Sequence, residues 1–340
     1  MSQPVLVAGA VGSPYSRKMR AVLRYRRIPS RWVHQLSPEQ ENLPPPPLPL
    51  LPVVYMPGPD GGYEATSDST FQIKRLEAEH LGRSIIPDDP AIAFLDFLIE
   101  DYADEWATKM MFHYRWAIQE NVDNANNLLP RWNMDVPEEI CEGFADTFGK
   151  RQVGRLSVVG SNPETGPIIE ASYKRLLDIL ERHLREQRFT LGRRPGRGDF
   201  GLFGQLSQLV GVEPTSQALA RAAAPRVITW CDNVEDLSGI EVEASDWTAR
   251  DALPDTLREL LAEIGRTYAP FLLANAKALE TGAQAVDGTV DGTRWTQDPF
   301  KYQGKCLQWL REDYAALAPS DRAAVDAALK GSGCEILFDG

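Results

Sequence analysis

The sequence predicts a small mixed α/β domain followed by an all-α domain. Over about the first 82 residues, short apolar runs, turns and helical patterns alternate in the order β-α-β-β-β-α. The segment from Pro87 to Pro90 then has the composition of a linker. Beyond it, apolar residues recur almost throughout at the spacing of amphipathic helices. These three observations predict the fold class, and the elements follow in chain order.

The chain opens with a strand and a helix. Val5 to Ala8 is a short apolar run that ends at a glycine, as a buried strand does. Ser13 suits the N-cap of a helix, and Pro14 is tolerated at the first helical position. The remaining elements of this domain are predicted as a strand at Trp32–Val33, a proline run at 42–52, a strand at 53–55, a returning strand at 63–65 and a helix from 66–69 to about Leu81.

The helical part begins with an apolar stripe. Its residues recur every four positions, at Phe94, Leu98, Tyr102, Trp106 and Met110. The acidic residues between them are expected on a solvated face: Asp101, Asp104 and Glu105. Further helices are predicted at about 136–153, 167–187, 198–211, 216–237, 254–281, 299–317 and 320–330, with a loop at 282–296. We therefore expect one domain at 1–83 and a helical domain at 84–340.

Composition excludes several classes of protein. The net charge of −12 argues against general nucleic-acid binding, although residues 1–38 carry +7 and the remainder −19. That basic start is compatible with an organelle-targeting segment, but the predicted strand and Pro14 favour a folded unit whose positive field serves a small anion. No apolar run approaches the roughly 18 residues of a membrane span. The four cysteines are far apart, which favours free thiols over disulfides or zinc.

Two rival motifs are weaker. Gly9 and Gly12 follow a strand as in a dinucleotide-binding loop, but the third glycine position is Tyr15 and no second βαβ unit follows. Glu77 and His80 have the spacing of a carboxylate-bridged di-iron site, but a second copy is missing. The four histidines form no HxH or HExxH pair, so we expect no metal site.

Four motifs together resemble the glutathione transferase superfamily. Ser13-Pro14-Tyr15-Ser16 is similar to the element at the first strand-to-helix turn of thioredoxin-fold glutathione proteins. Pro52 falls where the family keeps a cis-proline, and Asp68-Ser69 resembles its acidic-Ser pair. The segment 192–200 resembles the capping element of a buried helix, in which Asp199 is expected as the cap partner and Gly196 replaces the usual Ser or Thr. A second departure is the proline run, which replaces the family's second-helix region.

The resemblance covers residues 4–240. It implies a thioredoxin-like glutathione-binding domain at 1–83 and a helical domain whose family-like core is 84–240, with an extra extension at 241–340. It also implies a thiol activated at Ser13, with Tyr15 and Ser16 in reserve, in a field that Arg17 and Lys18 would strengthen. The glutathione contacts that it implies are Leu51, Pro52, Asp68 and Ser69, and an apolar electrophile pocket would use Tyr102, Trp106, Met110 and Tyr114.

The resemblance further implies a cytoplasmic homodimer with glutathione as co-substrate, an apolar electrophile as second substrate and no metal.

Alternative interpretations of these residues stay open. Ser13 and Asp68-Ser69 are also good helix caps, and the aromatic stripe also suits core packing. The chain could be a non-catalytic scaffold of this fold, or a glutathione-dependent lyase, isomerase or dehalogenase.

Overall fold

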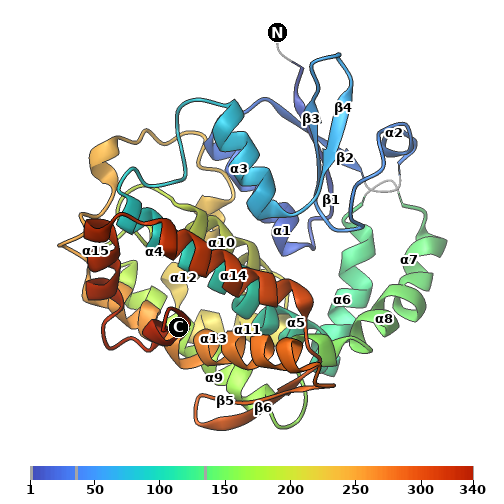
Figure 1. Ribbon diagram of the computed structural model, residues 1–340. Helices are drawn as coiled ribbons and strands as arrows, with labels where there is room; N and C mark the ends of the chain where they lie inside the picture. Colours follow the sequence, from blue (N-terminus) through green and yellow to red (C-terminus); the bar gives the residue numbers. More distant parts are fainter. Residues whose placement is uncertain (1–2, 35–36, 134–135, 340) are drawn as a thin grey trace.

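A computed structural model describes residues 3–34, 37–133 and 136–339 of the chain. It confirms a small α/β domain followed by a helical domain (Figure 1). The N-terminal elements are β1 (Val5–Gly9), α1 (Pro14–Tyr25), β2 (Ser30–His34), α2 (Pro38–Glu41), β3 (Val53–Pro57), β4 (Tyr63–Thr66) and α3 (Ser69–Glu79).

The four strands form one mixed sheet in the order β2-β1-β3-β4. β1 is parallel to β2 and antiparallel to β3, which is antiparallel to β4. Because strand side chains alternate, Val5 and Val7 pack with α1 and α3 in the main core, whereas Leu6 and Ala8 pack with Val33 on the other face. Both faces of β1 are therefore buried, and its ends are fixed in position.

The helical part contains α4 (Pro90–Tyr102), a π-helical turn η1 (Ala103–Ala107), α5 (Thr108–Ala117), α6 (Gln119–Arg131), α7 (Glu138–Phe144), a second π-helical turn η2 (Ala145–Gly149), α8 (Lys150–Val153), a 3₁₀ turn η3 (Leu156–Val159), α9 (Gly166–His183), α10 (Arg197–Leu209), α11 (Pro214–Ala223) and α12 (Pro225–Val234). The predicted single helix at 216–237 is wrong, because Pro225 interrupts it. The predicted cap of α10 is confirmed: Asp199 accepts hydrogen bonds from the N–H groups of Gly196 (2.9 Å) and Thr190 (2.8 Å).

The C-terminal extension contains η4 (Ala244–Asp246), α13 (Asp255–Thr281), β5 (Val286–Val290), β6 (Thr293–Gln297), α14 (Lys301–Ala316), α15 (Pro319–Leu329) and η5 (Cys334–Leu337). The loop predicted at 282–296 is wrong, because β5 and β6 form an antiparallel hairpin there. Its two-residue turn, Asp291-Gly292, has φ values of 51° and 73°, as a tight hairpin turn requires. Val286, Val290 and Trp295 bury one face of the hairpin.

The extension packs into the core and is not a separate unit. α13 contacts α9 and α4, and α14 and α15 lie along α4, where Figure 1 shows them in red across the bundle. The four cysteines are free thiols and all are buried. In the part of the chain that the structure describes, no helix is long and apolar enough to cross a membrane. Within the same residues, no group of three or more His, Cys, Asp or Glu side chains could hold a metal ion.

Candidate functional site

Two of the predicted contact segments meet at one edge of the sheet. Ser13 follows the carboxyl end of β1, and the Leu51–Pro52 peptide bond, which is cis, precedes β3. Because β1 and β3 are antiparallel with Ala8 opposite Val53, the chain leaving β1 lies beside the chain entering β3. Leu51 precedes the first residue that pairs in the ladder, so its backbone N–H and C=O lie at that edge.

Two side chains bring the start of α3 to the same edge. The Lys18 ammonium donates a hydrogen bond to the Ser69 hydroxyl (3.3 Å), which links α1 to α3. The Gln72 amide donates to the carbonyl oxygens of Pro52 (3.0 Å) and Thr66 (3.0 Å). No sequence signal distinguishes Gln72, because a polar residue on a helix is normally exposed. The three predicted contact segments are thus connected through hydrogen bonds.

Ser13 is the N-cap of α1. Its hydroxyl oxygen accepts a hydrogen bond from the Ser16 N–H (3.3 Å), and Pro14 occupies the first turn. A serine hydroxyl that accepts in this way still has its own hydrogen to donate. No acidic residue lies in the first turn of α1, so the partial positive charge of the helix N-terminus is not opposed within that turn.

The two reserve hydroxyls already have partners within the fold. The Tyr15 hydroxyl donates to the backbone carbonyl of Asp104 (2.7 Å) and lies 3.3 Å from the Thr108 hydroxyl. Burial raises the pKa of Tyr15 well above its usual value, with a smaller contribution from the nearby carboxylates. The Ser16 hydroxyl is buried and accepts from the N–H of Ala10 (3.3 Å). These contacts favour Ser13 as the hydroxyl presented by the loop.

Three side chains fix the loop between β1 and α1. The Val11 carbonyl accepts hydrogen bonds from Arg17 (Nε, 3.0 Å) and Gln208 (Nε2, 3.3 Å). The Gly12 carbonyl accepts from Arg115 (Nη1, 2.7 Å). Since two of these donors come from the helical domain, that domain holds the loop in which Ser13 lies.

The positive field expected from the first turns of α1 is smaller than the sequence suggests. Lys18 is buried between the carboxylates of Glu100 (2.8 Å) and Asp104 (2.5 Å), and these ion pairs offset its charge. Arg17 faces Glu235 at 3.7 Å. Burial alone would lower the pKa of Lys18, but the two carboxylates outweigh it and raise that pKa well above its usual value. The helix N-terminus and the Ser13 hydroxyl therefore remain as the main sources of stabilisation for an anion.

The solvated acidic face predicted on α4 and η1 is wrong. Asp101, Asp104 and Glu105 are only 7–8% exposed. They are covered because α1 packs on one side, through Lys18, and α13 on another, where the Tyr268 hydroxyl donates to Asp101 (2.6 Å). Burial is the largest cause of the raised pKa values of Asp101, about 7, and Asp104, about 6.

The predicted electrophile-pocket residues lie in the hydrophobic core. Their side chains are at most 2% exposed: Tyr102, Trp106, Met110 and Tyr114. The Tyr102 ring lies 6.2 Å from Tyr268, and the Trp106 ring lies 5.1 Å from Trp295. The extension supplies both of these partners. The arrangement matches the core-packing alternative, and a role for the four residues in holding an electrophile stays a prediction.

Two apolar side chains at the end of α6, which are not part of the predicted aromatic stripe, lie beside the Ser13 loop. A Cβ atom at Gly12 would be 2.5 Å from Cδ2 of Leu129 and 2.9 Å from the ring of Trp132. The Trp132 ring also lies 5.7 Å from the Arg17 guanidinium. These two apolar side chains are half-buried beside the loop. No sequence motif distinguishes them, because their position depends on how α6 docks.

Asp68 has a partner from the far end of the chain. It is the N-cap of α3, with φ +78°, and its Oδ1 accepts from the N–H of Thr70 (3.1 Å). Its Oδ2 accepts from the hydroxyl of Tyr302 on α14 (2.6 Å). No sequence motif indicates this contact, since the two residues are 234 positions apart.

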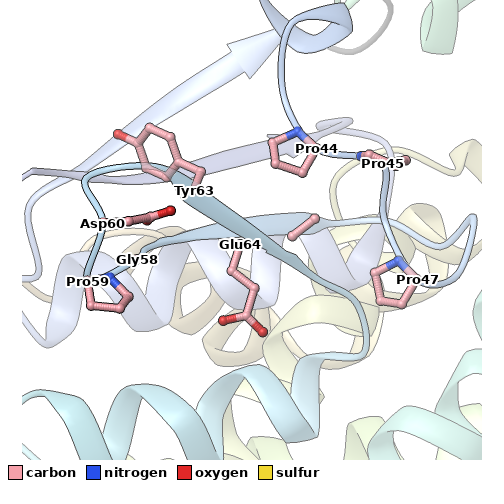
Figure 2. A pocket seen from close by; sticks show the side chains of 9 residues that line it. Pro44, Pro45, Pro47, Gly58, Pro59, Asp60, Tyr63 and Glu64 are labelled. Atoms are coloured by element: carbon pink, nitrogen blue, oxygen red, sulfur yellow. The ribbon is translucent and has the colours of Figure 1, made fainter.

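An open hollow of about 560 Å³ lies elsewhere on the N-terminal domain. Its lining combines the proline run with the β3–β4 hairpin, and Figure 2 shows Pro44, Pro45 and Pro47 on one side and Tyr63 and Asp60 on the other. Asp60 accepts from the Gly62 N–H (3.0 Å), and Glu64 pairs with Arg75 (2.8 Å). None of the predicted site residues lines this hollow.

Comparisons with known proteins agree with the motifs. Residues 8–84 match the family model described as Glutathione S-transferase, N-terminal domain, and residues 154–233 match Glutathione S-transferase, C-terminal domain. No curated protein matches the chain.

Solved structures with similar folds include three bacterial proteins. A glutathione transferase family member from Pseudomonas fluorescens with two glutathione bound is 16% identical, over 67% of this chain and 87% of that one, with a TM-score of 0.41. A Methylobacterium radiotolerans glutathione S-transferase in complex with glutathione sulfonate is 20% identical, over 71% and 99%, with a TM-score of 0.37. A GST-like protein from Pseudomonas syringae is 15% identical, over 68% and 67%, with a TM-score of 0.42.

Proposed function

Because the chain belongs to the glutathione S-transferase superfamily, we propose that it binds glutathione and activates its thiol for attack on an electrophilic small molecule. The observation that carries this proposal is the meeting of three segments at one edge of the sheet. They are the N-terminus of α1 at Ser13, the cis Leu51–Pro52 bond and the start of α3 at Asp68-Ser69. Two hydrogen bonds connect them, one from Lys18 and one from Gln72.

In the proposed complex, the glutathione sulfur lies at the N-terminus of α1. A thiol has a pKa of about 8.5 and reacts as the thiolate. The helix N-terminus carries about half a positive charge, and the Ser13 hydroxyl can donate one hydrogen bond to the sulfur. We expect these two interactions to lower the thiol pKa by about 1–2 units.

The thiolate then forms a carbon–sulfur bond with the electrophile. The leaving group departs with its electron pair, or, in an addition, the product takes up a proton from solvent. Serine has no thiol and forms no mixed disulfide, so the site favours conjugation over disulfide exchange. Leu129 and Trp132, which contact the loop at Gly12, offer apolar surface beside the sulfur.

The rest of the tripeptide would be held by backbone and charge. The backbone N–H and C=O of Leu51 can pair with the cysteinyl unit as a neighbouring strand would. Asp68 suits the ammonium of the γ-glutamyl end, and the Ser69 hydroxyl with the N-terminus of α3 suits its carboxylate. No step of this scheme uses a metal.

Two further expectations belong to this proposal. By similarity to the family, we expect a cytoplasmic protein that forms a homodimer. α14 and α15 cover α4, so any dimer contact has to use other surfaces or the extension itself. Light scattering during size-exclusion chromatography tests this, since a dimer has twice the chain mass of 37.9 kDa.

Calorimetric titration with reduced glutathione tests the proposed function. Wild-type protein should bind at millimolar concentration or below, and the double variant Asp68→Ala/Ser69→Ala should bind at least about tenfold more weakly. Ser13→Ala should still bind, but the thiol pKa, followed by thiolate absorbance, should return towards about 8.5 and turnover should fall about 10–100-fold. Absence of heat and of any thermal shift for wild type would refute the proposal. Turnover that survives in Ser13→Ala would remove the role of that hydroxyl.

A further inference from the structure

Helix α14 lies outside both matched family regions, yet it packs against the start of α3, where the proposed contacts Asp68 and Ser69 lie. The Phe71 ring of α3 meets the Trp309 ring of α14 edge to face, with centroids 5.3 Å apart. Trp309 in turn lies 5.8 Å from the ring of Tyr302. The Phe71–Trp309 contact places the middle of α14 beside the first turn of α3.

The polar contact at this junction is a hydrogen bond from Tyr302 to Asp68 (2.6 Å). The other carboxylate oxygen of Asp68 accepts from the N–H of Thr70 (3.1 Å). One local donor and one donor 234 positions away therefore fix the orientation of this carboxylate. A carboxylate oxygen can accept more than one hydrogen bond, so Asp68 can still accept a third donor from a ligand.

We propose that Tyr302 is a positioning residue that holds Asp68 for the ammonium group of a γ-glutamyl ligand. The inference rests on the function proposed above and extends it, because it makes the C-terminal extension part of the ligand site. Burial, together with the neighbouring Asp68, raises the pKa of Tyr302 far above its usual value, so the hydroxyl remains a donor at physiological pH.

This arrangement predicts selectivity. Tyr302 makes its contact with Asp68 and acts on the ligand only through that carboxylate. Its hydroxyl should therefore matter for ligands that carry the α-ammonium and be irrelevant for ligands that lack it. A structural hydrogen bond that merely holds α14 in place would affect both kinds of ligand equally.

The test compares two ligands on four proteins by calorimetry. The ligands are reduced glutathione and glutaryl-cysteinyl-glycine, the same tripeptide without the α-ammonium. The proteins are wild type, Tyr302→Phe, Asp68→Ala and the double variant. Tyr314→Phe is the matched control, because Tyr314 lies on the same helix and also donates to an aspartate, Asp326 (2.5 Å). Thermal melting of each variant checks that it is folded.

Tyr302→Phe should raise the Kd for glutathione about 5–10-fold and leave the Kd for the glutaryl analogue unchanged. In the Asp68→Ala background the same substitution should have no further effect on glutathione, since the residue it acts through is gone. Tyr314→Phe should bind both ligands as wild type does. These three results together support the inference.

Other outcomes overturn it in distinguishable ways. If wild type binds glutathione but Tyr302→Phe changes the Kd of both ligands equally, or of neither, the inference fails and the proposed function stands. Tighter glutathione binding by Tyr302→Phe would also overturn it, because the hydroxyl would then compete with the ammonium. If wild type binds neither ligand, the proposed function fails and the inference fails with it.

Discussion

The N-terminal domain and the C-terminal extension attach to the same helical core through different chemistry. α1 docks through buried charge: Lys18 lies between Glu100 and Asp104. The extension brings aromatic rings to its interface, with Trp295 on Trp106 at 5.1 Å, beside a polar contact from the Tyr268 hydroxyl to Asp101 (2.6 Å). A buried ion pair depends on both partners and on pH, whereas ring packing depends on volume and shape. The two regions should therefore respond differently to substitution and to pH.

The difference also bears on function. The charged interface, formed by Lys18 with Glu100 and Asp104, involves the helix that follows the Ser13 loop. Lys18 also connects this interface to Ser69 at the start of α3. The aromatic interface lies in the core, and the extension reaches the candidate site where α14 meets α3. Changes at the first interface should disturb ligand binding together with stability, and changes at the second should disturb mainly stability.

Removing a ring from the aromatic interface is the first way to test the comparison. Trp295→Ala should lower the free energy of unfolding by about 3–5 kcal/mol, because it leaves a cavity between Trp106 and Phe271. Urea denaturation measures the change. Leu81→Ala is the control, since Leu81 is 99% exposed and its loss should change stability by less than about 0.5 kcal/mol. A loss below about 1 kcal/mol for Trp295→Ala would show that the extension is only loosely attached.

Removing the cation from the charged interface is the second way to test the comparison. Lys18→Met should destabilise the protein by about 3–5 kcal/mol at neutral pH, because buried Asp104 loses its ion-pair partner and Glu100 keeps Arg197 at 3.8 Å. Burial already raises the pKa of Asp104 to about 6, and loss of Lys18 should raise it further above the unfolded value, so the stability of the variant falls as pH rises from about 4. The loss should therefore shrink towards pH 4. Arg31→Met, which breaks the exposed pair with Glu39, should change little at any pH. A pH-independent loss for Lys18→Met would contradict the ionic account.

Neutralising a buried carboxyl group beside the extension is the third way to test the comparison. Burial raises the pKa of Asp101 to about 7, and the charges of Asp104 and Glu100 add to the effect. Since the unfolded value is about 4, wild type should lose stability as pH rises from about 4 to 7. Asp101→Asn keeps an acceptor for the Tyr268 hydroxyl and removes this titration. Melting should therefore show a gain of about 2 kcal/mol over wild type at pH 8 and none at pH 4. An equal effect at both pH values would mean that Asp101 does not titrate in this range.

The sequence predicted the local elements well, because local patterns determine them. Ser13 followed by Pro14 is a cap followed by a first turn, and the helix begins there. The position of Pro52 was inferred from the resemblance, and the bond before it is cis in the structure. The β5–β6 hairpin could also have been found. Its Asp291-Gly292 dipeptide lies between Val290 and Trp295, and Asp-Gly between apolar residues of two short β-rich runs is a hairpin signal.

The long-range contacts of the site could not be predicted in this way. A lysine on an amphipathic helix is normally exposed, so nothing in α1 indicated that Lys18 is buried with Glu100, 82 positions away. The acidic residues of η1 were expected in solvent for the same reason. Tyr302 lies in a segment without family resemblance, and its contact with Asp68 arises only once α14 has packed on α3. Each of these contacts depends on tertiary packing, which cannot be inferred from a single sequence.

The smallest expected effect concerns the N-terminal loop itself. Gly12→Ala would place a methyl group 2.5 Å from Leu129 and 2.9 Å from Trp132, so these side chains, or α6 with them, have to shift. We expect a loss of about 1–2 kcal/mol and a change in tryptophan fluorescence. Gly143→Ala in α7 is the control, because its methyl group meets no atom within 4 Å. That variant should gain up to about 1 kcal/mol from helix propensity. If Gly12→Ala is as stable as wild type and its fluorescence is unchanged, α6 does not close on the Ser13 loop. Leu129 and Trp132 would then be too far away to hold an electrophile there.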